Sequence, residues 1–188
     1  MSPLEIAGTV LGLINIVLLI RRSVWNFPVA MAMVSCIGVV LFGARLYAEA
    51  GLQVFFFVVN AWGWWMWSRA KGRGDTVPVR WLDWPSRIGW AAGAAIFSVL
   101  LGLALARWTD AALPMADSAV AGMSVVAQIL LGLRRIENWV LWIVIDVVSI
   151  ALYLDRGLNL LAALYFAFLV LSVVGLREWT RSTRMETA

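Results

Sequence analysis

Long apolar runs dominate this sequence and limit what it can fold into. A helix needs about 20 apolar residues to span the hydrocarbon core of a bilayer. Runs of roughly that length recur along the 188 residues, and we predict membrane-spanning helices at 4–20, 25–43, 50–68, 88–106, 118–132, 138–154 and 160–179. The runs are continuously apolar and do not alternate, which disfavours a β-barrel. The sequence therefore predicts an all-α integral membrane protein with seven transmembrane helices.

The composition excludes several other classes of protein. Hydrophobic residues make up 63% of the chain and charged residues 14%, whereas about a quarter of a soluble domain is charged. The chain has no His and one Cys, Cys36, so we expect no imidazole catalysis, no internal disulfide, no metal site and no cofactor. The net charge of +4 forms no basic stripe apart from the apolar runs, and no nucleic-acid partner is expected.

The basic residues are distributed unequally between the two sides of the predicted membrane. Of the 15 Lys and Arg residues, only Arg45, Arg107 and Arg156 lie in loops on one side, and the other 12 lie on the opposite side. The positive-inside rule then places the N-terminus outside and the C-terminus in the cytoplasm. Arg21 and Arg22 follow the first run rather than precede it, which is the reverse of a cleavable signal peptide.

The sequence also contains an internal duplication. Shifting the chain by 112 residues aligns 26–67 with 138–179 without a gap, and the shared Asn, Gly and Trp positions carry the match. Because three is an odd number of membrane crossings, two three-helix bundles joined directly would lie in opposite orientations in the membrane. A linker helix between them gives both bundles the same orientation. We predict a 3+1+3 arrangement of two parallel three-helix bundles, with parts at 1–70, 71–112 and 113–188. Transporters built from such repeats bind substrate between them near the bilayer midplane.

Polar side chains within two of the predicted spans mark candidate binding residues, because each needs a partner or a cavity in the membrane. The first polar row is Gln53, Asn60, Trp64 and Trp67, at steps of seven, four and three. The second polar row is Asn138, Trp142, Asp146, Ser149 and Tyr153, at steps of four, four, three and four. Each spacing keeps its row on one helical face. Indoles stack on flat or cationic rings, and carboxamides bind hydroxyl groups, so the rows suit a small, planar, polar solute.

Other roles remain open for some of these residues. Asn60 and Asn26 also suit hydrogen bonds between helices. Asp146 is suited either to balance a cationic ring or to hold an interhelical network, and Gln128 is compatible with either a binding or a packing role. Trp67 is also expected as an interfacial aromatic residue.

Three further residues outside the rows are expected to have structural roles. Gly63 and Gly175 are expected to permit close helix approach. Glu137 is expected to stabilise the start of its helix.

The stretches LYAEAGLQVFFFVVNAWGWWMWSR (46–69), DSAVAGMSVVAQILL (117–131) and RRIENWVLWIVIDVVSIALY (134–153) resemble the PnuC family of bacterial nicotinamide riboside transporters. The resemblance covers nearly the whole chain. It implies a seven-helix 3+1+3 fold related to SWEET transporters, a homotrimer, and facilitated uptake of nicotinamide riboside across the bacterial inner membrane for NAD biosynthesis. It also implies that Asn138, Trp142 and Gln53 contact substrate, as do Asn60 and Trp64 by a less specific match.

Alternative functions are retained beside this one. The same fold carrying thiamine, riboflavin or a deoxynucleoside is the first alternative, and a membrane-embedded enzyme or a structural scaffold is disfavoured. No phosphate-binding loop is present, so ATP-driven transport is not expected. We therefore predict passive alternating access and no catalytic residues. The predicted substrate-binding set is Gln53, Asn60, Trp64, Gln128, Asn138, Trp142 and Asp146.

Overall fold

A computed structural model describes residues 3–43, 47–70, 77–108, 114–155, 157 and 159–186. Within these ranges the chain forms seven α-helices: α1 (Pro3–Ile20), α2 (Asn26–Gly43), α3 (Tyr47–Ala70), α4 (Trp84–Trp108), α5 (Pro114–Gly132), α6 (Glu137–Asp155) and α7 (Asn159–Glu186). Each of them overlaps one predicted span, and the all-α prediction is confirmed.

Several helices extend beyond the apolar runs. α4 and α5 each begin four residues earlier than predicted, and a Pro lies in the first turn of both, where its missing N–H costs least. α7 continues to Glu186 instead of ending at Trp179. Its last turns are rich in Arg and Glu, which are good helix formers although they are too polar for a membrane core.

Five of the described helices, α2, α4, α5, α6 and α7, are long and apolar enough to cross a membrane. The apolar part of α1, Ile6–Ile20, is shorter. α3 has 24 residues, which is ample length at about 1.5 Å per residue, but it carries the first polar row. The chain is thus a multi-pass membrane protein. Among the seven predicted spans, α1 and α3 are the two that do not meet the length and hydropathy of a membrane span.

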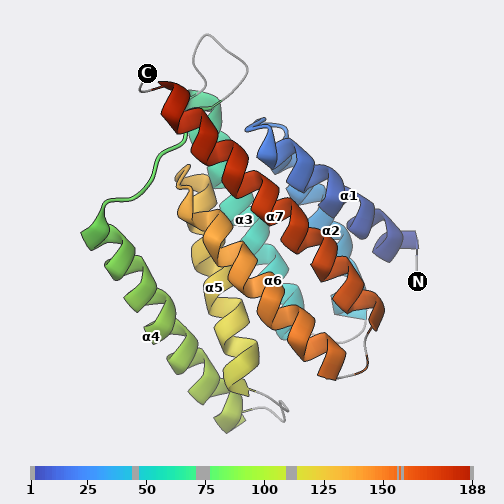
Figure 1. Cartoon of the computed structure of the whole chain (residues 1–188). Helices are drawn as coiled ribbons and strands as arrows, with labels where there is room; N and C mark the ends of the chain where they lie inside the picture. The colour runs from blue at the N-terminus through green and yellow to red at the C-terminus, as the bar shows by residue number, and fades with distance from the viewer. Residues whose placement is uncertain are drawn as a thin grey trace. The chain divides into compact units, whose positions relative to one another are not determined.

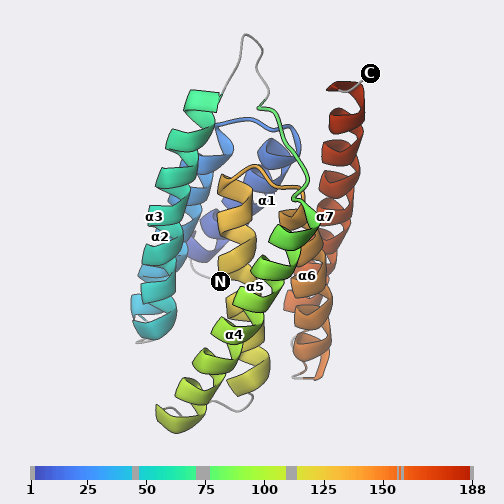
Figure 2. The same ribbon diagram turned by 90° about the vertical axis from the view of Figure 1, so that its left-hand side faces the viewer.

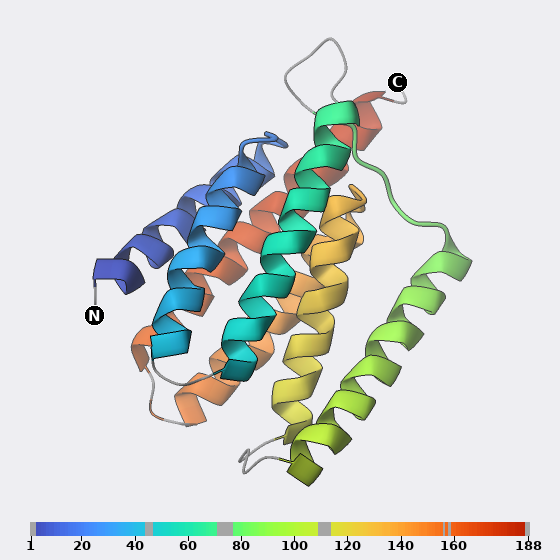
Figure 3. The same cartoon turned by 180° about the vertical axis from the view of Figure 1, so that it is seen from behind.

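The chain divides into two compact units. Unit 1 contains Met1–Val79, Leu131–Arg134 and Arg177–Ala188, that is α1, α2, α3 and the ends of α5 and α7. In this unit α2 contacts both α1 and α3, and the three helices lie side by side (Figure 3).

Unit 2 contains Arg80–Leu130 and Arg135–Leu176. Here α4 runs obliquely past α5 (Figure 2), and α6 and α7 are neighbours (Figure 1). A small core of Ala94, Val126 and Leu130 joins α4 to α5. The helices approach closely at Gly102, where a Cβ would lie 2.7 Å from the Ser118 hydroxyl. The predicted three-part division and the 3+1+3 arrangement stay predictions.

Candidate functional site

The ends of α1 and α5 have the same geometry at positions 112 residues apart. Each helix is followed by an Arg with positive φ, 55° at Arg22 and 62° at Arg134. The amide of each Arg donates at 2.9 Å to the carbonyl three residues earlier. The next amide donates to the carbonyl five residues earlier, at 3.0 Å after α1 and 2.8 Å after α5. Both turns therefore follow the Schellman pattern of helix ends, with Arg where glycine is usual.

Asn26, the first residue of α2, and Asn138, the second residue of α6, repeat this correspondence. The Nδ2 atoms of Asn26 and Asn138 each donate at 2.6 Å to the backbone carbonyl three residues earlier. Both side chains are buried, with exposed fractions of 1% and 0%. The Oδ1 atom of Asn138 is buried and accepts no hydrogen bond within the described residues. The fold therefore uses the amide nitrogen of this predicted substrate residue and leaves its oxygen as an open acceptor.

Two indoles in unit 1 form hydrogen bonds that connect one repeat to the other. The Nε1 of Trp67, near the end of α3, donates at 3.2 Å to the carbonyls of Leu131 and Gly132 at the end of α5. The Nε1 of Trp179 in α7 donates at 3.2 Å to the carbonyl of Leu19 at the end of α1. The 112-residue shift pairs Trp67 with Trp179 and Leu19 with Leu131, so the two bonds are reciprocal.

The two glycines predicted to permit close approach each lie against an aromatic side chain, whereas close approach of helix backbones stays a prediction. A Cβ at Gly63 would overlap the Phe27 ring, and one at Gly175 would lie 2.5 Å from the Trp139 ring. Both rings are buried, and each belongs to the residue that follows the aligned Asn, Asn26 or Asn138. The predicted duplication thus has a structural counterpart in matched turns, caps and packing.

The first polar row lies in unit 1. Gln53 lines a groove of about 670 Å³ between α2 and α3, together with Ser35 and apolar side chains. Asn60 is 4% exposed, and its Nδ2 donates at 2.8 Å to the carbonyl of Phe56 one turn earlier. Trp64 is 40% exposed. The row therefore combines a buried carboxamide with an accessible ring.

Trp67 departs from the rest of this row. It is fully buried, with its ring centroid 5.1 Å from that of Phe27 and 5.9 Å from that of Trp179. The expectation of an interfacial position is wrong for Trp67, because its indole N–H serves a helix end. Trp65 is half exposed and lies under the guanidinium of Arg69 at 4.2 Å.

The second polar row lies on α6 in unit 2. Asp146 is buried, and its Oδ2 accepts a 3.0 Å hydrogen bond from the hydroxyl of Ser172 on α7. Trp142 is half buried between the levels of Asn138 and Asp146. The ring of Tyr153 meets that of Tyr165 on α7 at 5.1 Å. The Asp146 contact supports an interhelical network, one of the two roles expected for this carboxylate.

Gln128 and Glu137 occupy different environments in unit 2. Gln128 on α5 is 8% exposed. Glu137 is the first residue of α6, as expected, and its carboxylate Oε1 also pairs with the Nε of Arg87 at 2.8 Å. Among the described residues, no cluster of His, Cys, Asp or Glu is placed to hold a metal ion.

The two repeats share their framework but differ where the polar rows lie. The 112-residue shift pairs Gln53 with Tyr165, Asn60 with Ser172, Ala30 with Trp142 and Val34 with Asp146. The sequence analysis did not single out Ser172 and Tyr165, although the alignment of the repeats pairs them with two residues of the first polar row, Asn60 and Gln53. The framework is repeated, but the polar positions are not. Such an arrangement suits an asymmetric solute that binds in one orientation.

Known proteins match this chain along almost its whole length. Residues 2–181 match the family described as nicotinamide mononucleotide transporter. The nicotinamide riboside transporter PnuC of Escherichia coli (strain K12) is 29% identical over 209 residues, which cover 98% of this chain and 87% of that protein. The riboflavin/roseoflavin transporter RibM of Streptomyces davaonensis is 29% identical over 189 residues, with 97% and 87% covered. The crystal structure of the vitamin B3 transporter PnuC is 25% identical, with a TM-score of 0.78, over 95% of this chain and 80% of that chain.

Proposed function

The chain belongs to the nicotinamide mononucleotide transporter family, and on this premise we propose that it carries nicotinamide riboside across the bacterial inner membrane by facilitated diffusion. Its named relatives are transporters, and it is a membrane transporter rather than an enzyme. The match over residues 2–181 carries the transport assignment. The substrate is the proposed part.

The charges of the two polar rows favour the riboside over the phosphorylated mononucleotide. The predicted binding set consists of carboxamides, indoles and one carboxylate, and contains neither Lys nor Arg. A phosphate group needs charged or backbone donors when it leaves water. A cationic pyridinium ring instead suits indole faces, and ribose hydroxyls suit Asn and Gln side chains.

Alternating access is the proposed mechanism. The first polar row on α3 and the second polar row on α6 would supply the groups that bind substrate, and the two repeats would alternate the access to it. The stacking residues are Trp64 and Trp142, with Gln53, Asn60, Gln128 and the Oδ1 of Asn138 as hydrogen-bonding groups. Asp146 in the second polar row would support the binding site through its hydrogen bond with Ser172.

Uptake into liposomes and calorimetry test the substrate. Purified protein in kinase-free liposomes should equilibrate labelled nicotinamide riboside without concentrating it. In calorimetry the riboside should bind more tightly than nicotinamide mononucleotide, thiamine or a deoxynucleoside. Stronger binding of the mononucleotide would contradict the charge argument and leave the transport assignment intact.

A matched pair of indole variants tests the site. Trp142→Ala should weaken riboside binding by about 1–3 kcal/mol, the value of one stacking ring. Trp65→Ala removes an indole that lies outside the predicted set and should leave affinity unchanged. Equal effects of the two substitutions would argue against stacking on Trp142.

Riboflavin is the second candidate substrate, because RibM is as similar to this chain as the Escherichia coli PnuC. Its three-ring system also stacks on indoles. Riboflavin belongs in the same calorimetric panel, where tighter binding than that of the riboside would change the substrate and preserve the fold.

Orientation and assembly are further parts of the proposal. The excess of Lys and Arg on one side supports an external N-terminus and a cytoplasmic C-terminus. The resemblance to PnuC supports a homotrimer. Reporter fusions at each terminus test the first, and light scattering of the purified protein tests the second.

A further inference from the structure

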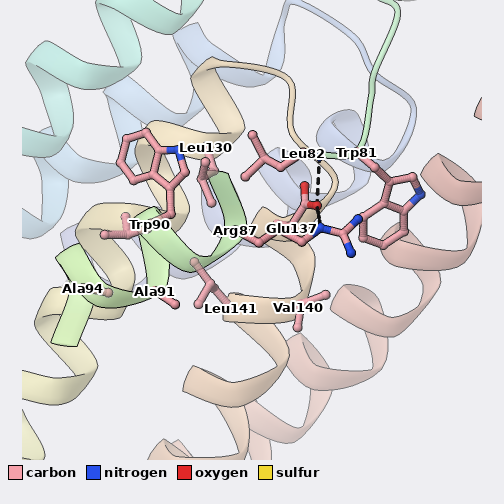
Figure 4. Close-up of a pocket in the computed structure, with 11 residues that line it drawn as sticks. Trp81, Leu82, Arg87, Trp90, Ala91, Ala94, Leu130, Glu137, Val140 and Leu141 are labelled. Atoms are coloured by element: carbon pink, nitrogen blue, oxygen red, sulfur yellow. Dashed lines mark hydrogen bonds and ion pairs between the residues drawn. The ribbon is translucent and has the colours of Figure 1, made fainter. Parts of the chain in front are cut away.

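An apolar groove lies in unit 2, where the chain enters α4 and passes α5 and α6. Its volume is about 250 Å³. Figure 4 shows its walls, which come from Trp90, Ala91 and Ala94 on α4, Leu130 on α5 and Leu141 on α6. The polar side chains at the groove, Arg87 and Glu137, lie at one end.

The polar end is held in place by several contacts. The Oε1 of Glu137 accepts hydrogen bonds from the backbone amide of Leu82 at 2.9 Å and from the Nε of Arg87 at 2.8 Å (Figure 4). The guanidinium of Arg87 also lies 5.1 Å from the Trp81 ring and 5.6 Å from the Trp84 ring. Its side chain is 36% exposed.

This groove does not suit the proposed solute of the polar rows. Pockets that enclose drug-sized ligands measure roughly 300–1,000 Å³ and offer several placed polar groups. The groove is smaller, and its one ion pair is already formed. Trp81 and Trp84 are 37% and 70% exposed, as is typical of indoles at the level of lipid headgroups. An apolar slot below an interfacial cation has the chemistry of a lipid site.

The charges at the mouth favour an anionic lipid. A backbone bond of 3.1 Å from the amide of Ile136 to the carbonyl of Arg80 holds Arg80 beside Arg135. With Arg87, these give three cations against the carboxylates of Glu137 and Asp83. The charged residues that line the groove, Arg87 and Glu137, balance each other. The net positive charge comes from the backbone-paired Arg80 and Arg135 next to the lining segments, and basic pockets between transmembrane helices bind anionic headgroups.

We propose that this groove binds an anionic phospholipid, with its phosphate at Arg87 and Arg80 and part of one acyl chain between α4, α5 and α6. The lipid would fill the slot between the linker helix and the second repeat. Its binding would then stabilise α4 against α5.

Native mass spectrometry of the full chain tests this proposal with phosphatidylglycerol as the probe. Phosphatidylcholine with the same acyl chains tests the charge, and inorganic phosphate tests the need for a chain. Ala91→Phe fills the groove and leaves both residues of the ion pair unsubstituted, and Ala92→Phe places the same ring one residue along, at a position that does not line the groove. Phosphatidylglycerol should bind Ala91→Phe at least about tenfold more weakly than Ala92→Phe, a difference of roughly 1.4 kcal/mol.

A second variant tests the charge separately. Arg80→Gln changes an exposed side chain and should reduce the preference for phosphatidylglycerol over phosphatidylcholine. Equal lipid binding by the two phenylalanine variants would overturn the proposal. So would a loss of subunits in Ala91→Phe without any lipid effect, which would assign the groove to a second copy, or displacement of lipid by nicotinamide riboside.

Discussion

Trp67 and Trp179 each donate an indole hydrogen bond of 3.2 Å to the end of a helix in the other repeat. The accepting carbonyls, Leu131 and Leu19, also accept a backbone amide at 2.9 Å. A carbonyl oxygen has two lone pairs, so the Schellman turn and the indole together saturate it. The ends of α1 and α5 are thereby capped by residues far away in the sequence.

Trp67→Phe and Trp179→Phe should destabilise the protein by similar amounts, at least about 1 kcal/mol each, because each loses a hydrogen bond and part of a buried ring system. Each substitution keeps an aromatic ring and removes one donor, and the carbonyl keeps its backbone partner. Thermal unfolding in detergent measures both, with Trp65→Phe as the exposed control. A clear loss for only one of the two buried positions would contradict the reciprocal arrangement.

Gly175→Ala should be destabilising by about 1–3 kcal/mol, because the added methyl group overlaps the buried Trp139 ring and the core has no room for it. Gly63→Ala should behave alike against Phe27. Gly93→Ala is the control, since a Cβ there meets open space, and Ala is the better helix former. Thermal unfolding again measures the change.

The double variant Gly175→Ala with Trp139→Phe checks the cause. The smaller ring should relieve part of the clash, so the double variant should be more stable than the sum of the two single variants predicts. Additive losses would show that the glycine matters for another reason.

The apolar runs predicted the seven helices because membrane spans need continuous apolar surface, and the aligned Asn, Gly and Trp positions predicted the duplication. Burial was harder to predict. Trp67 and Trp65 lie two residues apart near one helix end, and hydropathy treats them alike, yet one is buried and the other half exposed. The difference arises from the opposite repeat, where α5 offers carbonyls to Trp67.

The candidate site shows a similar limit. The spacing of Asn138, Trp142 and Asp146 predicted one face of α6, but it said nothing about α7. The Ser172 hydroxyl that binds Asp146 lies 26 residues away, and an isolated Ser in an apolar helix is a weak signal. The spacing also did not predict that the Asn138 side chain caps a turn, as the Asn26 side chain does.

Asn26 provides a matched control for the binding role of Asn138. Both side chains make the same 2.6 Å turn bond, so Asn26→Ala and Asn138→Ala should lose comparable stability, about 1 kcal/mol. Only Asn138→Ala should also lose riboside affinity, since only that oxygen belongs to the predicted site. Calorimetry on folded protein separates the two effects, and equal affinities would reduce Asn138 to a structural residue.

Asp146→Asn addresses ion coupling. The substitution keeps an oxygen that accepts the Ser172 hydrogen bond and removes the ionisable group from the second polar row. If transport is passive, uptake into liposomes by the wild type and by this variant should not respond to an imposed proton or sodium gradient. Ser172→Ala is the companion variant, because it breaks the hydrogen bond that Asp146→Asn keeps while leaving the carboxylate in place. Gradient-driven accumulation by the wild type and by Ser172→Ala, lost in Asp146→Asn, would instead assign Asp146 to ion coupling and exclude facilitated diffusion.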